Sequence, residues 1–263
     1  MVVFIFVPVM IFSVFFQFLS AEDAEDVSPK FQLVDPEMAP LDIRPQVMRG
    51  YKIMLETAKE VPEYAKDAVS CTNCHFSAGN TLGGYRGGLS LVGAALKYPI
   101  SLGNDQWYTL AERINACFKK SLNGKPMPLE SEDMKSIVAY LKWISSPVEL
   151  LPNVYALPWL GLKKIRIDHR MDPETGKRLY QVHCALCHGV DGQGQSRKED
   201  LSYPPLWGPH SFNDAAGMNV LPILATFIQR NMPYEDPSLT LAEALDIAAY
   251  IISQPRPHYE EKE

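Results

Sequence analysis

Two five-residue stretches decide the fold of this chain, Cys71-Thr72-Asn73-Cys74-His75 and Cys184-Ala185-Leu186-Cys187-His188. The Cys-x-x-Cys-His pattern is the attachment signature of c-type haem, in which both cysteines form thioethers with one porphyrin. The histidine that follows each pair is then positioned to bind the iron from one side. We therefore predict two covalently bound haem c groups. The predicted attachment and iron-binding residues are Cys71, Cys74 and His75 for the first haem, and Cys184, Cys187 and His188 for the second.

Other uses of paired cysteines fit the pattern less well. A zinc site built from both pairs needs no histidine after each, and the pairs lie far apart in the sequence. A thioredoxin-like redox pair belongs in a βαβ context, which neither stretch has. Structural disulfides are disfavoured because the chain has an odd number of cysteines, five.

The N-terminal segment predicts export. From Val2 to Leu19 the sequence is apolar apart from Ser13 and Gln17, and small residues then give way to acidic ones. We predict a signal peptide at residues 1–21. The alternative is an uncleaved membrane anchor, because a run of ~18 apolar residues nearly spans a bilayer. In either case we expect the remainder to face a periplasm-like compartment. The formal charge of -6 argues against a nucleic-acid partner.

An internal duplication organises the chain. The two motifs are offset by 113 residues, and each is followed by a helical pattern, a loop with Met-Pro and a helix ending near Ser-x-Pro. Such a repeat indicates two similar units. We predict an all-α fold of two tandem class I cytochrome c domains, at residues 40–149 and 173–257. A long ordered linker at 150–172 is expected to join them.

Three helices can be placed from local patterns. Apolar residues recur with helical spacing from Glu132 to Ser145 and again after Thr240. A further helix is predicted from Thr109 to Ser121. Glu112 and Glu243 each follow a threonine by three residues, which is the spacing of a capping box.

The second iron needs a ligand on its far side, and Met232 is the best candidate. It precedes Pro233 in a turn of the kind in which small cytochromes carry a thioether, which favours ferrous iron and raises the potential. Met218 and His210 are competitors. The histidines expected at the surface or in packing are His169, His183 and His258.

For the first iron the candidates are Cys117 and Met127. A free cysteine is often only a small buried thiol. Arg113 and Ser121, however, lie four residues on either side of Cys117 and share its helical face, with Lys120 beside them. Cationic neighbours and an iron would lower the thiol pKa and favour the thiolate. Met127 lies in the Met-Pro loop that the duplication predicts, so the residues alone leave both ligands open.

Two blocks of sequence resemble one known family. Residues Arg113 to Gly124, RINACFKKSLNG, are similar to the first-haem region of the dihaem thiosulfate dehydrogenases, also called tetrathionate reductases. Residues Pro204 to Asn213, PPLWGPHSFN, followed by Ala216-Gly217-Met218, resemble another block of that family. The resemblance covers both predicted domains, and these blocks are more specific than the haem motifs.

The resemblance implies an activity and a ligand set. The activity is the reversible joining of two thiosulfates into tetrathionate, with release of two electrons. His75 and Cys117 would hold the first iron, and His188 and Met232 the second. A thiolate ligand lowers the potential and a thioether raises it, so we expect electrons to pass from the first haem to the second. A soluble or membrane-bound cytochrome c is the expected electron partner.

The residues suit this chemistry. Thiosulfate is a compact dianion, so an acidic protein needs a local basic pocket, for which we expect Arg113, Lys119 and Lys120. Arginine can also bind oxyanions bidentately. Ser121 could donate a hydrogen bond to the same anion. The sulfur of Cys117 is expected either to accept the substrate's outer sulfur covalently or only to tune the haem.

Two positions depart from the family pattern. Family members carry a second pocket arginine after a Tyr-Pro pair, whereas residues 100–106, after Tyr98-Pro99, contain none. Arg86 and Lys97 are candidate replacements. Some members have lysine before the methionine ligand, where this chain has Asn231, so no lysine ligand exchange is expected. The alternative functions are a dihaem electron carrier without substrate chemistry and a Sox-type sulfur-carrier cytochrome.

Overall fold

The structure is a computed structural model that describes residues 32–65, 69–149, 165–197 and 201–260. The predicted signal peptide or anchor at residues 1–21, and most of the predicted linker, therefore lie outside the described residues. Within the described ranges, every helix is too short or too polar to cross a membrane.

The first half is built on a close helix pair. Helix α1 (Arg44–Leu55) packs against α4 (Glu132–Glu149). A Cβ added at Gly50 of α1 would overlap the backbone carbonyl of Ser136 in α4. The two helices therefore approach at a distance that a residue with a side chain would prevent.

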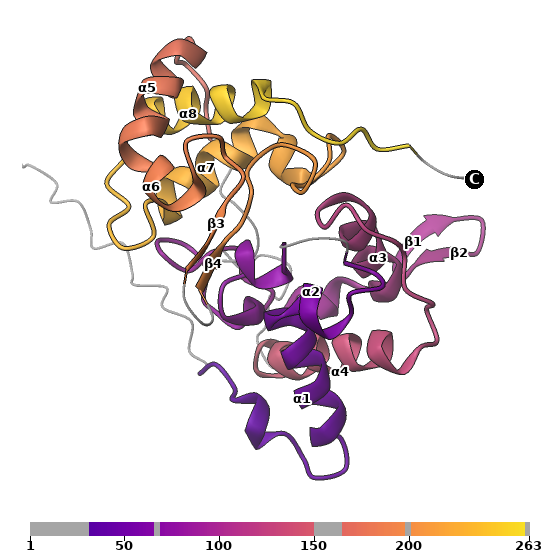
Figure 1. The fold of residues 1–263 in the computed structure, drawn as a ribbon. Helices are drawn as coiled ribbons and strands as arrows, with labels where there is room; N and C mark the ends of the chain where they lie inside the picture. Colours follow the sequence, from indigo (N-terminus) through magenta and orange to yellow (C-terminus); the bar gives the residue numbers. More distant parts are fainter. Residues whose placement is uncertain (1–31, 66–68, 150–164, 198–200, 261–263) are drawn as a thin grey trace, which may run out of the picture. The chain divides into compact units, whose positions relative to one another are not determined.

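The second half repeats this arrangement. Helix α5 (Pro173–His183) packs against α8 (Leu241–Ser253), as the orange and yellow helices of Figure 1 show. A Cβ at Gly176 of α5 would overlap the backbone carbonyl of Asp246 in α8. The duplication inferred from the motifs thus extends to the contact that holds each helix pair together.

Shorter elements connect these pairs and carry the haem motifs. In the first half they are η1 (Pro36–Met38), α2 (Thr57–Glu60), η2 (Cys71–Asn73), η3 (Ser77–Gly79), η4 (Ala94–Lys97) and α3 (Leu110–Lys120). In the second half they are α6 (Ala185–His188), η6 (Gly217–Asn219) and α7 (Leu221–Asn231). The predicted all-α class is confirmed, and each half carries one haem motif.

Two small hairpins were not predicted from the sequence. Strand β1 (Ile100–Gly103) pairs antiparallel with β2 (Gln106–Tyr108), and β3 (Gln195–Arg197) pairs with β4 (Leu201–Tyr203). The first hairpin turns through Gly103, Asn104 and Asp105, which all have positive φ. Glycine, asparagine and aspartate tolerate this backbone, so the turn signal was present in the sequence.

Helix α4 corrects the predicted end of its segment. The helix was expected to stop at Ser145 but continues to Glu149, with Pro147 inside its last turn. Proline removes the N–H that would bond the carbonyl of Trp143. The hydroxyl of Ser146 donates to that carbonyl instead, at 2.8 Å. The helix therefore passes through the proline.

The other predicted helices begin where their capping signals indicate. Thr109 and Thr240 cap α3 and α8, and both capping boxes are formed with Glu112 and Glu243. The carboxylate of Glu112 accepts the backbone N–H of Thr109 at 2.6 Å. These caps fix the start, and hence the helical phase, of the element that carries Cys117.

In the part of the chain that the structure describes, buried apolar residues form three clusters. One belongs to the first half and includes Tyr140 and Met127, and a second belongs to the second half and includes Tyr180. The third draws on both halves, because Cys74 and Phe76 of the first motif region border a cluster that contains Phe212, Ala216, Met218 and Phe227. The first haem motif is thus packed against residues of the second half.

The glycine contacts give a test of the duplicated helix pair. We expect Gly176→Ala to destabilise the second half by about 1–3 kcal/mol, because the added methyl meets backbone that cannot rotate away. This overlap outweighs the roughly 1 kcal/mol that alanine adds to helix propensity. The measurement is thermal unfolding of the haem-loaded protein. Gly217→Ala is the matched control, because its Cβ meets nothing within 4 Å; equal melting temperatures would contradict the prediction.

Candidate haem-linked active site

The two motif histidines are held in the same way. The Nδ1–H of His75 donates to the carbonyl of Leu89 at 2.8 Å, and that of His188 donates to the carbonyl of Pro204 at 2.9 Å. Burial lowers the pKa of both imidazoles, which favours their neutral forms. A histidine that donates through Nδ1 presents the lone pair of Nε2 to a metal. This geometry fits an iron ligand in each motif.

The motif cysteines fit haem attachment and not a shared zinc ion. Cys71 borders the first core cluster and Cys184 the second, so the pairs belong to different packing units. Among the described residues, no group of three or more His, Cys, Asp or Glu side chains is placed to hold a metal ion. A haem iron needs few protein ligands, because the porphyrin supplies four nitrogens.

Helix α3 brings Arg113 and Cys117 into direct contact. The Nη1 of Arg113 donates to the Sγ of Cys117 at 3.0 Å. The negative charge of the thiolate form of Cys117 is the largest cause that raises the pKa of Arg113. The predicted shared face is therefore formed, and the one unassigned cysteine has a cation as its partner.

Cys117 also lies near the first haem motif. Burial raises the pKa of Cys71 to about 11 and that of Cys74 to about 12, and the charge of Cys117 contributes to both shifts. Arg113 likewise contributes, after burial, to the lowered pKa of His75. The Arg113–Cys117 pair thus lies within electrostatic reach of all three motif residues.

Met127, the rival ligand, is packed on another side of α3. Its side chain is 1% exposed within the first core cluster. Asn115 holds its backbone through two hydrogen bonds of 2.8 Å, one to the N–H and one to the carbonyl. Asn115 and Cys117 are two residues apart, so their side chains leave the helix in roughly opposite directions.

The candidates for the second iron differ in their surroundings. Met232 follows α7 directly and borders both the second and the third core cluster. Met218 is buried in the third cluster, whereas His210 is exposed on a loop. His169 bonds the carboxylate of Asp246 at 2.8 Å, which accords with the packing role expected for it.

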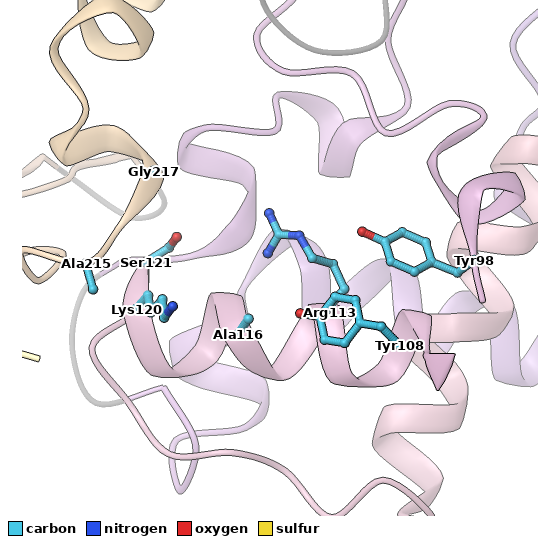
Figure 2. Close-up of a pocket in the computed structure, with 8 residues that line it drawn as sticks. All are labelled: Tyr98, Tyr108, Arg113, Ala116, Lys120, Ser121, Ala215 and Gly217. Carbon is cyan, nitrogen blue, oxygen red and sulfur yellow. The ribbon is translucent and has the colours of Figure 1, made fainter. Parts of the chain in front are cut away.

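A cavity of about 460 Å³ opens beside α3. Residues of α3, the first hairpin region and the second half form its wall; they are Tyr98, Tyr108, Arg113, Ala116, Lys120, Ser121, Ala215 and Gly217. Figure 2 shows the Tyr98 hydroxyl directed toward the Arg113 guanidinium. The second half is held here by Asn213, whose side chain donates to the carbonyl of Lys119 at 2.8 Å.

The cavity wall carries two cations and two tyrosines. Arg113 and Lys120 are its only charged residues among those that the structure describes, and Ser121 adds a hydroxyl. Lys119, Arg86 and Lys97 do not line it. Cys117 is not among the lining residues either and meets the wall through its contact with Arg113. The positive charges at the wall are therefore those of Arg113 and Lys120.

Comparisons with known proteins match both halves of this chain. The family model described as SoxA/TsdA, cytochrome c domain, matches residues 61–150, and the model described as cytochrome c matches residues 173–255. The thiosulfate dehydrogenase of Allochromatium vinosum is 33% identical over 218 residues, which cover 82% of this chain and 80% of the relative. That of Thiomonas intermedia is 36% identical over 82% of this chain and 68% of its own length.

The chain belongs to the thiosulfate dehydrogenase family. It carries two covalently bound haem c groups, one in each cytochrome c domain. The solved thiosulfate dehydrogenase (TsdBA) from Marichromatium purpuratum has a TM-score of 0.77 and 29% identity over 86% of this chain. This chain spans half the length of that protein.

Sequence reasoning missed several wall residues of this family member. Tyr98 was noted only as part of a Tyr-Pro pair and Gly217 only within a block that resembles the family, and Tyr108 and Ala215 were not singled out. Tyr108 ends β2 opposite Ile100, and its ring centroid lies 6.1 Å from that of Tyr98. The contacts of Asn213 bring Ala215 and Gly217 to α3. No local sequence pattern predicts a contact between residues so far apart in the chain.

The C-terminal tail also reaches the cavity wall. The ammonium of Lys120 lies 5.2 Å from the ring centroid of Tyr259. The carboxylate of Asp214 accepts the backbone N–H of Tyr259 at 2.8 Å and bonds Nδ1 of His258 at 2.5 Å. The tail is thus attached next to Ala215, and Tyr259 stabilises one position of the Lys120 side chain.

The strength of the tail's attachment is predicted to depend on pH, because His258 forms part of it. The hydrogen bond to Asp214, its charge and that of Glu260 raise the pKa of His258 above the ordinary value of 6.5. Because the pKa of His258 is raised in the folded state, its contact with Asp214 stabilises the attached tail fully at pH values below 6.5. Its contribution is lost as the pH rises through the raised pKa.

We expect an NMR titration of the reduced protein to give His258 a midpoint above 6.5, and Asp214→Asn to lower that midpoint. Asp236→Asn, at an exposed aspartate, serves as the control. The same midpoint in the wild type and in Asp214→Asn would contradict the assignment.

Proposed function

We propose that this protein interconverts thiosulfate and tetrathionate in the periplasm. Two thiosulfate dianions join through a new bond between their outer sulfurs, which yields one tetrathionate dianion and two electrons. The observation that carries the proposal is the Arg113–Cys117 contact beside a small cavity with two cations. Thiosulfate dehydrogenases at 33% and 36% identity support the same reaction.

We also propose the ligands of the two irons and the extent of the two domains. His75 and Cys117 bind the first iron, and His188 and Met232 bind the second. The geometry that supports the first pair is the proximity of Cys117 to the first motif and the separate packing of Met127. Residues 40–149 form the first domain and 173–257 the second. When bound, the haems accept and pass on single electrons.

The protein's own residues bind and orient the anions. Arg113 can hold an oxyanion with one part of its planar guanidinium while Nη1 remains bonded to the Sγ of Cys117. Lys120 supplies a second positive charge, and Ser121 can donate a hydrogen bond to a sulfonate oxygen. These groups offset the repulsion between two dianions that must approach sulfur to sulfur.

Electrons leave through the second domain to a cytochrome partner in this proposal. The third core cluster supports a short path, because Cys74 of the first motif and Met232 both border it. Three large apolar side chains are more than two-thirds exposed at or near the second motif, namely Val182, Leu186 and Val190. An apolar surface of this kind suits transient contact with another redox protein.

Steady-state turnover tests the activity. We expect the purified dihaem protein to oxidise thiosulfate with an artificial acceptor and to reduce tetrathionate with a reduced viologen. Arg113→Ala is expected to lose about 10²–10³-fold in turnover, the range for loss of one anion-stabilising donor. Arg113→Lys should recover part of it, since the charge returns without the planar fork.

Lys97→Ala is the control for these variants, because Lys97 is an exposed cation outside the cavity wall. Turnover in neither direction by the wild-type protein would defeat the proposal and favour an electron carrier. Retention of a persulfide on Cys117 without turnover would favour a sulfur-carrier cytochrome instead.

Low-temperature electron paramagnetic resonance tests the first ligand pair. We expect the oxidised protein to show a low-spin signal typical of thiolate ligation, because Cys117 lies near the first haem motif and accepts a hydrogen bond from Arg113. Cys117→Ala should abolish that signal, and Met127→Leu, which preserves the buried volume, should leave it unchanged. A wild-type spectrum of two His/Met haems, without the thiolate signal, would instead assign the ligand to Met127.

A further inference from the structure

We infer that Asn231 is a positioning residue that ties the ligand loops of both haems into one hydrogen-bonded unit. The inference rests on the proposed function in one respect, namely that His75 and Met232 are iron ligands. It assigns a role to the position before Met232, for which the sequence predicted only that lysine exchange is absent.

Asn231 is fixed at both ends of its side-chain amide. It is the last residue of α7, it is completely buried, and it directly precedes Met232. Its Nδ2 donates to the carbonyl of Phe227 within α7 at 3.1 Å. Its Oδ1 accepts the backbone N–H of Gly88 at 2.8 Å. The amide therefore has one partner in each half of the protein.

The Gly88 side of this contact leads directly to the first iron ligand. Gly88 precedes Leu89, whose carbonyl accepts the Nδ1–H of His75 at 2.8 Å. The N–H of Leu89 returns to the carbonyl of Cys74 at 2.9 Å. Asn231 thus supports the residue that orients the His75 ring, and it does so from the position next to Met232.

Gly88 allows this approach because it lacks a side chain. Its φ is +63°, and a Cβ there would lie 2.7 Å from the Phe76 ring and 2.9 Å from the carbonyl of Cys74. The loop is therefore pressed against the first haem motif on one side and bonded to Asn231 on the other. Little room remains for it to move independently of either.

Two further hydrogen bonds join the same segments. The backbone N–H of Arg86 donates to the carbonyl of Arg230 at 2.8 Å. The hydroxyl of Tyr85 donates to the carbonyl of Pro237 at 2.6 Å. Residues 85–88 are thus bonded to residues 230–237, which contain Met232. Partners of this kind, one bond removed from a metal ligand, set ligand orientation and tune the metal.

A substitution at Asn231 is therefore expected to change the reduction potentials of both haems. Leucine at this position has a similar volume but neither accepts the N–H of Gly88 nor donates to Phe227. A purely structural residue of the second domain would affect stability and the second haem alone. The first haem is therefore the informative readout, because Asn231 lies in the other half of the sequence.

The experiment is a visible spectroelectrochemical titration of the dihaem protein with Asn231→Leu. We expect the reduced-to-oxidised ratio of each haem, at a fixed applied potential, to change severalfold relative to the wild type. Thr226→Val is the matched control, since it is buried in α7 and loses a hydroxyl bond to Pro222 within the same helix. Thr226→Val should change the reduction potential of neither haem by a comparable amount.

Tyr85→Phe provides a second variant that keeps the core intact, because Tyr85 is 62% exposed. This substitution removes only the bond to Pro237. Although Tyr85 lies in the first half, we expect its loss to shift the reduction potential of the second haem. The inference is overturned if Asn231→Leu changes the reduction potential of the second haem alone, or of neither haem. If Asn231→Leu does not fold, an unchanged reduction potential of the second haem in Tyr85→Phe overturns the inference.

Met232→Ala separates this inference from the ligand proposal. If its visible spectrum shows no loss of a methionine ligand, the ligand proposal fails, whatever Asn231→Leu does. If that ligand is lost while Asn231→Leu leaves the first haem unchanged, the ligands stand and the coupling fails.

Discussion

The hydrogen bond from Arg113 to the sulfur of Cys117 is the interaction on which the site depends. It requires both residues on one face of α3, and that face is set by the Thr109 cap at the start of the helix. The cavity beside it also requires the end of α3 to meet the second half, where the side chain of Asn213 donates to the carbonyl of Lys119. The phase of α3 and its contact with the second half together build one cavity wall that carries two cations.

Local signals predicted the parts of this protein that local physics controls. The haem motifs, both capping boxes and the face shared by Arg113 and Cys117 follow from spacing along the chain. The end of α4 was wrong because a side chain, Ser146, compensates for the proline. The contacts of Tyr259 with Lys120 and of Asn231 with Gly88 join residues remote in sequence. No periodicity encodes such pairs, so they required the structure.

The two halves show how one fold supports different chemistry. Both use a helix pair that meets at a glycine and a motif histidine that donates to a backbone carbonyl. Among the described residues, only the first half adds the pair of a cation and a free cysteine, together with the packed rings of Tyr98 and Tyr108. The halves thus differ in a few side chains on a repeated scaffold.

The position of the C-terminal tail has a practical consequence for protein production. Tyr259 touches a cavity residue, and its backbone is bonded to Asp214. A purification tag joined just after Glu260 would therefore emerge close to the cavity beside α3. Polyhistidine is a poor choice there, because its imidazoles are potential haem ligands and become cationic at mildly acidic pH. An uncharged tag behind a flexible spacer, removed before assay, avoids both effects.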